Sequence, residues 1–557
     1  MRAKAALSTL AIAGSIAHAQ PADAIYANAN VYTVDDARPR ATAFAVRDGA
    51  IVAVGDESDL IAHKGPDTEW VNLDGATVVP GLIDAHAHLA GLGQFELGVI
   101  DLSYATSYQQ VIDLVRARAA DTPAGDWIIG QGWDHESWPE REMPEHGPLT
   151  EAVPDHPVWL KRVDGHASLA NSKAMDLAGV SPETPEPVGG DMLRDADGSL
   201  TGVFVDNAER LVELAIPDSA YPDMAAKFLE GQRLCFEAGL TGMHDMGLPP
   251  GALDLLRELE HAGDLKLRVH AMVGARKAIE FMNDRQPYVG DRLQVRAVKL
   301  YMDGAMGSRG AWMLEPYADR PTDEDGEPWV GLNVTDPEFV ETVANVCLQR
   351  GYQLCTHAIG DRANREVLDA YERAFKTRAA TKSDHRFRVE HAQLLAPAEI
   401  LRFAQLGVIP AMQARHATSD MRWVDERVGT ERAKGAYAWQ SLIEAGSIVA
   451  NGSDFPVEPH QPLLGFYASV TRQNAAGEPA GGWMPEERLT REQALKSFTI
   501  WAAHAAFMED RVGSITPGKR ADFTVLDRDI MACPAAEILD AKILRTVVDG
   551  ETVFRVE

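Results

Sequence analysis

Short apolar runs alternate with amphipathic helical patterns over most of the chain. Eight apolar runs are predicted to be strands, at residues 78–88, 242–246, 267–273, 298–303, 353–357, 387–391, 408–413 and 448–454. Helical spacing lies between several of them, at residues 338–349, 363–377 and 397–406. Strands separated by helices favour parallel pairing, and eight is the number that a (β/α)8 barrel needs. We therefore expect an α/β fold with a TIM-like barrel; a doubly wound sheet is the alternative.

Both ends of the chain carry short strand patterns outside this series. They lie at residues 24–31, 41–47 and 51–55 and again at 522–526, 543–548 and 552–556. Each set is too small to bury a core alone, so we expect the two to meet in one small β-sandwich.

One gap in the series, from about residue 100 to 235, is too long for a single crossover. It has strand patterns of its own at residues 127–130, 158–162 and 201–205, and we interpret it as an insertion after the first barrel strand. The predicted division is then 20–79 with 506–557 for the composite sandwich, 80–100 with 236–505 for the barrel, and 101–235 for an inserted substrate-selecting subdomain.

The first residues have the pattern of a secretory signal peptide. Arg2 and Lys4 precede an apolar run over residues 5–17, which is too short to span a membrane, and Ala17-His18-Ala19 is a cleavage motif. We expect cleavage after Ala19 and a periplasmic or secreted protein; an unprocessed amphipathic helix is the alternative.

The charge restricts the classes of partner, and the number of cysteines bears on disulfide bonds. A formal net charge of −30 makes nucleic acid and anionic membranes poor partners. A small-molecule substrate fits this surface, and homo-oligomerisation stays open. The four cysteines imply no disulfide framework, and Cys347 and Cys355 are expected to be buried thiols.

Metal-ligand residues gather at the ends of the predicted strands. His86 and His88 end the first strand, and side chains at i and i+2 of a strand leave the same face, so their imidazoles should share one point. Further residues of this kind end later strands: Lys299, His357, His391 and Asp454. Because barrel sites form at the carboxyl ends of strands, this set would suit one or two divalent ions, with zinc expected. The alternative is that these histidines are hydrogen-bonded residues of the core without a metal.

These segments resemble the amidohydrolase superfamily and, within it, the YtcJ-like branch with the N-substituted formamide deformylases. The resemblance extends over nearly the whole mature chain. It rests on residues 80–88 (PGLIDAHAH), 132–134 (GWD), 162–166 (RVDGH), 299–311, 356–363 (THAIGDRA), 389–393 (VEHAQ) and 452–456 (GSDFP). The resemblance implies a metal-bearing barrel beside a composite sandwich. It also implies that Lys299 is carbamylated by CO2 and bridges two metal ions.

Carbamylation of Lys299 also has a physical rationale. A desolvated lysine has a lowered pKa, and its neutral amine can react with CO2 to give an anionic oxygen ligand. The alternative is that Lys299 pairs with Asp303 or another carboxylate and that the site holds one metal ion.

The ligand set predicts hydrolysis of an amide or another acyl C–N bond. Together with the resemblance, it leads us to expect a hydrolase of non-peptide C–N bonds in amides, N-formyl compounds or cyclic amides. A bound metal lowers the pKa of its water to about 7, and the resulting hydroxide attacks the carbonyl. Asp454 is the candidate catalytic residue, which takes the proton and returns it to the leaving nitrogen.

Residues in the insertion and the barrel loops are candidates for substrate binding. Trp133, Asp134 and His166 could form a pocket wall, and Arg309 and Arg415 could meet an oxyanion or a substrate carboxylate. A structural role is the alternative for each of them.

Two other classes of function remain open. A deaminase or isomerase on the same barrel would need a separate acid, for which Glu390 is the candidate, although we expect it to face away from His391. A catalytically silent binding protein would normally lack a ligand, and none is missing. The sequence does not identify the substrate.

Overall fold

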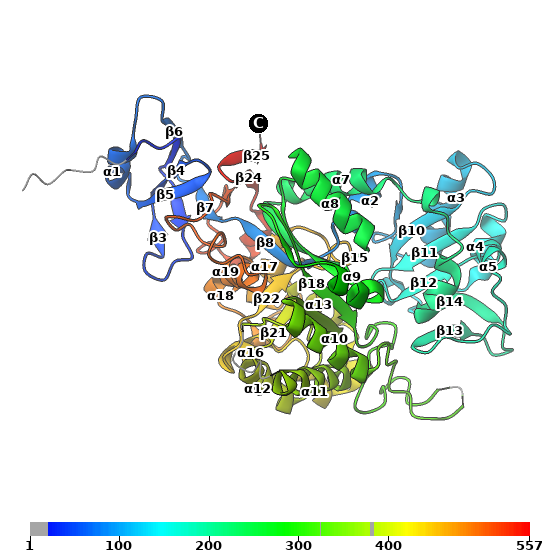
Figure 1. Ribbon diagram of the computed structural model, residues 1–557. Coiled ribbons are helices and arrows are strands. Elements are labelled where there is room, and N and C mark those ends of the chain that lie inside the picture. The colour runs from blue at the N-terminus through cyan, green and yellow to red at the C-terminus, as the bar shows by residue number, and fades with distance from the viewer. Residues whose placement is uncertain (1–19, 324, 379–383, 557) are drawn as a thin grey trace, which may run out of the picture.

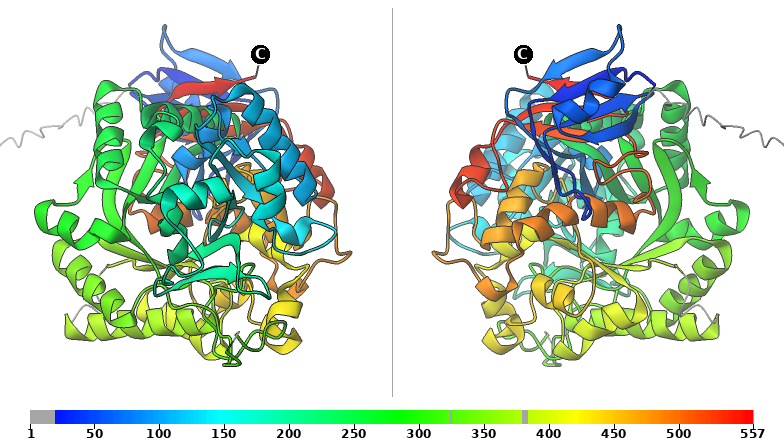
Figure 2. Two further views of the ribbon diagram at one scale, coloured as in Figure 1. Left: turned by 90° about the vertical axis from the view of Figure 1, so that its right-hand side faces the viewer. Right: turned by 90° about the vertical axis from the view of Figure 1, so that its left-hand side faces the viewer.

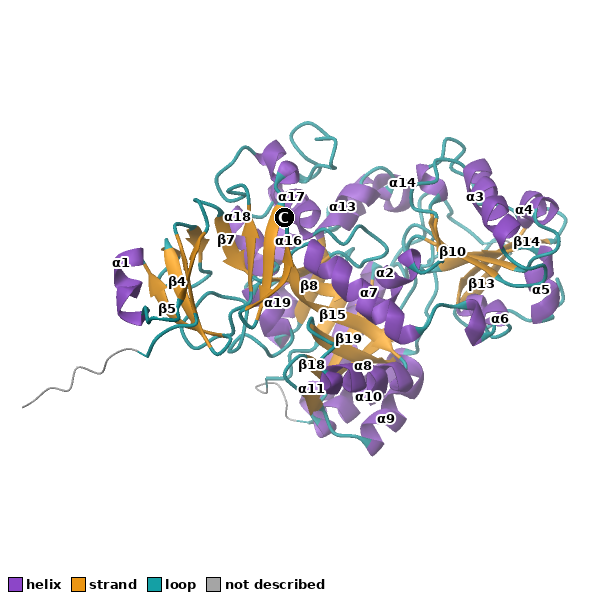
Figure 3. Cartoon of the chain, turned by 90° about the horizontal axis from the view of Figure 1, so that it is seen from above, coloured by secondary structure: helices purple, strands orange, loops and turns teal. Residues whose placement is uncertain are grey.

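A computed structural model describes residues 20–323, 325–378 and 384–556. Three parts follow one another in space: a β-sandwich, a barrel and a smaller α/β unit (Figure 1), and the same order is seen from above (Figure 3). The predicted signal peptide lies outside the described residues. In the part of the chain that is described, no helix is both long and apolar enough to cross a membrane.

The central part is a ring of eight parallel strands whose order in space follows the chain. They are β8 (Leu82–Ala87), β15 (Leu240–Leu248), β16 (Arg268–Gly274), β18 (Leu293–Tyr301), β19 (Gln353–Ala358), β20 (Arg388–His391), β21 (Ile409–Gln413) and β22 (Ala450–Gly452). The ring closes where Asp454 N–H donates to the His86 carbonyl (2.7 Å) and His88 N–H donates to the Phe455 carbonyl (2.9 Å). The predicted (β/α)8 barrel is confirmed.

Helices cover the outside of this ring, as the end views show (Figure 2). The predicted helices are present as α10 (Pro337–Arg350), α11 (Asp361–Thr377) and α12 (Pro397–Leu406). Both α10 and α12 begin with proline and end at a glycine in the left-handed conformation, Gly351 and Gly407. Because the helices shield the strands, every residue of β8, β19, β20, β21 and β22 is buried.

The two chain ends meet in one sheet, as predicted. Its order is β25 (Glu551–Arg555), β24 (Ile543–Val548), β23 (Phe523–Leu526), β7 (Thr77–Pro80), β2 (Asn30–Tyr32) and β3 (Arg40–Ala41). Strand β7 leads through Gly81 directly into β8, so the sandwich is joined to the first strand of the barrel.

A second sheet completes the sandwich, with the order β5 (Ala50–Gly55), β4 (Ala43–Arg47), β1 (Ala24–Ala27) and β6 (Glu69–Asn72). The rings of Tyr26, Phe44 and Phe523 pack between the two sheets. The single strand predicted at residues 24–31 was wrong, because Asn28 has a φ of 54° and the chain changes sheets there. Asparagine tolerates this left-handed conformation.

Residues between the first and second barrel strands build a sheet of their own. Its order is β13 (Gly190–Arg194), β14 (Leu200–Asp206), β12 (Ala167–Ala170), β11 (Val158–Arg162), β10 (Ile128–Trp133) and β9 (Ile100–Asp101). Ion pairs tie this unit to the loops of the barrel, among them Arg422–Asp134 (2.5 Å), Arg141–Glu426 (2.9 Å) and Arg427–Glu136. The unit is thereby held beside the carboxyl ends of the barrel strands.

His385 makes the stability of the barrel depend on pH. It is buried between Phe375 and Phe387, its Nδ1 accepts the N–H of Phe387 (3.0 Å), and its Nε2 faces the Leu406 carbonyl (3.1 Å). Only the neutral imidazole satisfies both contacts, and burial lowers the pKa of His385 from 6.5 to about 4. The unfolded chain therefore binds this proton first, so the free energy of unfolding falls as the pH drops from about 6.5 to 4.

We expect the variant His385→Asn to separate this effect from packing. Asparagine can still accept the N–H of Phe387 but does not titrate. At pH 7 the variant should melt below the wild type, and the difference in Tm should narrow as the pH falls to 4.5. Thermal melts of both proteins over this range measure it, and a difference that stays constant would contradict the assignment to His385.

Candidate metal centre and substrate cavity

The first barrel strand and the last one place three side chains together. His86 Nε2 lies 3.5 Å and His88 Nε2 3.3 Å from Asp454 Oδ1. That oxygen is buried and has no hydrogen-bond partner among the described residues. An unpartnered carboxylate oxygen facing two imidazoles is costly unless a cation joins them.

His391, at the end of β20, completes this group; only β21 separates β20 from β22 in the ring. Its ring centroid lies 4.5 Å from that of His86 and 4.6 Å from that of His357. Ligand atoms of His86, His391 and Asp454 all lie within 4.8 Å of one another. His391 and Asp454 have positive φ values, 70° and 65°, which turn both side chains out of their strands toward the shared point.

Hydrogen bonds orient two of these imidazoles. His86 Nδ1 donates to Glu390 Oε2 (2.6 Å), and His391 Nδ1 donates to Gln413 Oε1 (2.7 Å). Both rings therefore present Nε2 toward the group. This is the arrangement by which outer carboxylate and amide groups fix metal-binding histidines.

Glu390 was expected to face away from the site, and the structure places it against His86. Arg388 and Glu390 lie two positions apart on β20, so both side chains point into the barrel. There Arg388 Nε pairs with Glu390 Oε1 at 2.7 Å. His391 follows Glu390 directly but reaches the same centre, because its backbone leaves the extended conformation. Strict strand alternation missed this, although two charged residues at i and i+2 in a buried strand were a usable signal.

The electrostatic setting keeps the imidazoles neutral. Burial lowers the pKa of His86, His357 and His391 well below the usual value, and the neighbouring Lys299 ammonium lowers it further. Neutral imidazole is the form that binds a metal. Together with the unpartnered oxygen of Asp454, this donor set fits a divalent ion with nitrogen and oxygen ligands.

Lys299 lies on β18 beside the same group, with 1% of the residue exposed and Nζ 4.8 Å from the ring centroid of Tyr301. Asp303 is not its partner: the carboxylate of Asp303 accepts three backbone N–H groups, those of Trp312, Ile359 and Gly360. Among the described residues Lys299 has no carboxylate in ion-pair contact.

The α/β unit contributes His166 to this centre. Its ring centroid lies 4.9 Å from that of His357, and its Nδ1 donates to Asp206 Oδ1 at 2.6 Å. Burial alone would lower the pKa of His166, but the charge of Asp206 outweighs burial and raises this pKa to about 9. Asp206 was not foreseen from the sequence, because it lies on a different strand from His166.

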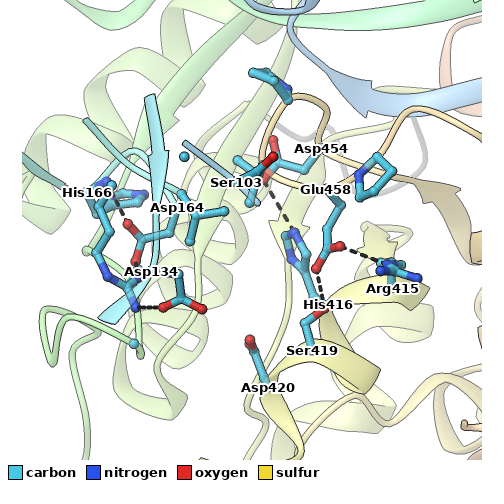
Figure 4. Close-up of a pocket in the computed structure, with 18 of the residues that line it drawn as sticks. Ser103, Asp134, Asp164, His166, Arg415, His416, Ser419, Asp420, Asp454 and Glu458 are labelled. Carbon is cyan, nitrogen blue, oxygen red and sulfur yellow. Dashed lines mark hydrogen bonds and ion pairs between the residues drawn. The ribbon is translucent and has the colours of Figure 1, made fainter. Parts of the chain in front are cut away.

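A cavity of about 490 Å³ extends from the centre between the α/β unit and α13 (Ala414–Asp420). Figure 4 shows residues from both sides of it. Of the residues predicted to bind substrate, Asp134, His166 and Arg415 line this cavity.

Two other predicted substrate residues lie elsewhere. Trp133 is 1% exposed inside the α/β unit, where its Nε1 donates to the Leu160 carbonyl (2.7 Å). Arg309 is absent from the residues that line the cavity, and its Nη2 pairs with Asp319 at 2.9 Å. Both predictions are corrected: Trp133 belongs to a core, and Arg309 is held by a carboxylate that sequence spacing could not identify.

The sequence and the fold are both similar to those of known proteins. The profile of the amidohydrolase family matches residues 69–554. The chain is 33% identical over 540 residues to the putative amidohydrolase YtcJ of Bacillus subtilis, covering 95% of this chain and 99% of that one. It is 31% identical over 544 residues to the N-substituted formamide deformylase of Arthrobacter pascens, covering 95% and 98%. The crystal structure of an uncharacterized metal-dependent hydrolase from Pyrococcus horikoshii is similar with a TM-score of 0.72 and 26% identity, over 92% of this chain and 99% of that one.

Proposed function

The chain belongs to the amidohydrolase family, and from that membership we propose that it is a metal-dependent hydrolase of a non-peptide C–N bond, in an amide, an N-formyl compound or a cyclic amide. The observation that carries the proposal is the convergence of neutral, buried imidazoles on the unpartnered oxygen of Asp454 at the barrel mouth. The deformylase among the relatives acts, by its name, on N-substituted formamides.

We assign the metal ligands from the same geometry. His86, His88, His391 and Asp454 would hold one ion, and Lys299 with His357 would help to hold a second if Lys299 carries a carbamate. Zinc is the expected metal because the donors are nitrogen and oxygen. When bound, such an ion supplies a water of lowered pKa and polarises the scissile carbonyl.

Asp454 is the group that can move the proton. Its Oδ1 faces His86 and His88, and its Oδ2 lies 3.8 Å from His416 Nε2. A carboxylate in this position can accept a proton from the attacking water and deliver it to the leaving nitrogen at the cavity side. His166 lines the opposite wall of the cavity with Asp206 behind it, which supports a role in contacting the substrate.

The deaminase or isomerase alternative loses its candidate acid. Glu390 is fully buried, does not line the cavity, and is engaged by His86 and Arg388. The silent binding protein also loses support, since each predicted metal ligand is present and buried or half-buried at the barrel mouth.

Metal analysis of the purified protein combined with a screen of N-formyl, N-acyl and cyclic amides tests the proposed function. We expect one or two zinc ions per chain and release of an amine from at least one class. Purified protein that holds its metal yet cleaves none of these C–N bonds, but deaminates or isomerises a substrate, would overturn the proposal.

We expect Glu390→Gln to weaken metal binding by about 10–100-fold, the usual effect of losing an outer carboxylate partner of a metal-binding histidine. Chelator competition on folded protein measures it. Glu399→Gln is the matched control, because Glu399 is also buried and paired with arginines, Arg365 and Arg402, but lies on α12 away from the site. Equal metal affinity in both variants would contradict the role of Glu390.

We further propose export with cleavage after Ala19 and a substrate-selecting role for the segment 101–235. N-terminal sequencing of protein from a periplasmic or secreted fraction should begin at Gln20. Active protein that retains Met1 in the cytoplasm would contradict export.

A further inference from the structure

The cavity beside the metal centre determines which substrates fit. It is lined by His357, His391 and Asp454 at one end and by residues of the α/β unit and α13 along its walls. A substrate whose reacting bond lies at the metal centre therefore has to place its remaining part in this cavity. The charges of the walls then decide what that part can be.

Every guanidinium in the cavity wall is already neutralised by a carboxylate. The pairs are Arg162 with Asp134 (2.8 Å) and with Asp164, Arg415 with Glu458 (2.9 Å), and Arg422 with Asp134 (2.5 Å). The wall contains no lysine among its described residues. A substrate carboxylate would have to break one of these pairs, so the earlier expectation that Arg415 meets a substrate carboxylate is not supported.

Three carboxylates in the same wall are not paired with an arginine. Glu96, Asp101 and Asp420 line the cavity, and none of them is in an ion pair among the described residues, although the charges of His416 and Arg422 act on Asp420 from a greater distance. Glu96 is exposed, and Asp101 accepts the N–H and hydroxyl of Ser103. Asp420 lies in the wall formed by α13, across the cavity from Asp134 of the α/β unit (Figure 4).

Asp420 is held so that one oxygen stays available. Its Oδ2 accepts both the Tyr437 hydroxyl and Gln393 Nε2 (3.0 Å). No described residue donates a hydrogen bond to Oδ1. Figure 4 shows the carboxyl group directed from the end of α13 toward the space between Asp134 and His416. A fixed carboxylate with a free oxygen in a partly desolvated wall is a binding point for a cation.

We propose that Asp420 is a specificity-determining residue that binds a cationic amino group in the part of the substrate remote from the scissile bond. This inference rests on the proposed function, and it names the substrate class within it: amides or formamides that also carry an ammonium group. Neutral analogues lose the charge-assisted contact, and anionic analogues meet a wall with an excess of negative charge.

Three series of N-formyl compounds with graded chain length test the proposal. They are mono-N-formyl diaminoalkanes, N-formyl alkylamines and formamido carboxylates, which end in an ammonium, a methyl and a carboxylate group. We expect the ammonium series to have a kcat/KM about 10–100-fold above the methyl series at the best length, the usual strength of a hydrogen bond to a charged group, with the carboxylate series lowest. Hydrolysis of all three series at similar rates would overturn the inference and leave the proposed function intact.

Variants of Asp420 locate the effect. Asp420→Asn should lower the preference for the ammonium series at least about tenfold, and Asp420→Glu should retain part of it. Asp101→Asn is the control for a general effect of wall charge, which is screened by salt and should change the preference far less. A preference that survives Asp420→Asn, or that falls equally with Asp101→Asn, would overturn the assignment to Asp420.

Binding of free diaminoalkanes and of free alkylamines to the metal-loaded wild type provides a measurement that needs no turnover. Calorimetry should show tighter binding of the diamine by about tenfold or more, with the difference reduced in Asp420→Asn. This result in a protein that hydrolyses no N-formyl, N-acyl or cyclic amide would overturn the proposed hydrolase and support the cation site. Equal binding of both amines to the wild type would overturn the cation site, even if the variants failed to fold.

Discussion

Lys299→Ala is expected to leave the protein with one metal ion in place of two and to lower the hydrolytic rate by about 10²-fold or more. Lys299 is buried beside the metal-binding group and has no carboxylate in ion-pair contact among the described residues. If it carries a carbamate, its removal takes away the oxygen ligands that join the two ions. An ion acting as a Lewis acid contributes several kcal/mol to transition-state stabilisation, which sets the size of the loss.

Short carboxylic acids should restore part of the activity of Lys299→Ala, because they can supply the missing bridge oxygens. Lys299→Arg should fail as well, since a guanidinium stays protonated and forms no carbamate. Lys227→Ala is the matched control: Lys227 is another buried lysine, on α7 (Met224–Glu237) over the ring of Tyr221. The metal content of the three variants tests whether Lys299 bridges two ions. A Lys299→Ala protein with two ions and full activity would rule out the bridge.

The barrel and its metal-binding end could be predicted because local patterns determine them. The run before His86 and the start of the segment 448–454 are mostly apolar because both faces of each strand are covered, and a histidine or aspartate at the end of such a run has few structural explanations. The sandwich could be predicted for a related reason, because β7 and β23 each need a partner that neither chain end contains alone.

Side-chain partners distant in the sequence could not be predicted. Arg309 and Arg415 looked available for a substrate anion, but Asp319 and Glu458 neutralise them. Trp133 looked like a pocket wall, yet its ring lies in the core of the α/β unit and its Nε1 donates to the Leu160 carbonyl. Such contacts depend on how loops pack against one another across the barrel mouth. The spacing of residues in the sequence does not predict this packing.

Backbone conformation limited the prediction within the site itself. Alternation along β20 placed Glu390 and His391 on opposite faces, and the positive φ of His391 cancels that alternation. The same kind of turn at Asp454 brings its carboxylate to His86 and His88. The positive φ values at the ends of these strands therefore bring the side chains of the centre together. A pattern of apolar and polar positions does not predict such backbone conformations.

Asp454→Asn is expected to lower the rate by about 10²–10⁴-fold while much of the metal stays bound. The amide keeps an oxygen donor of nearly the same shape toward His86 and His88, but it cannot accept a proton. The expected loss is the usual contribution of a general acid–base group. Excess zinc should not restore the rate, because the missing function is proton transfer and not metal affinity.

Removal of His86 or His88 should have the opposite response to added metal. Each substitution takes away metal affinity, so excess zinc should restore part of the lost rate by mass action. His86→Ala should need more zinc than His88→Ala, because His86 is the more buried of the two and is held by Glu390, whereas the His88 side chain is 35% exposed. Rate and bound zinc, both measured against total zinc, distinguish these variants from Asp454→Asn.

If added zinc brings Asp454→Asn back to full activity, Asp454 is only a ligand and another residue moves the proton. His416 would then be the first to examine, because its Nε2 is buried with no hydrogen-bond partner among the described residues and lies 3.8 Å from Asp454 Oδ2. His166 would be next, on the opposite wall with Asp206 behind it. Asp303 would be last, since three backbone N–H groups already occupy its carboxylate and leave it little freedom to take part in proton transfer.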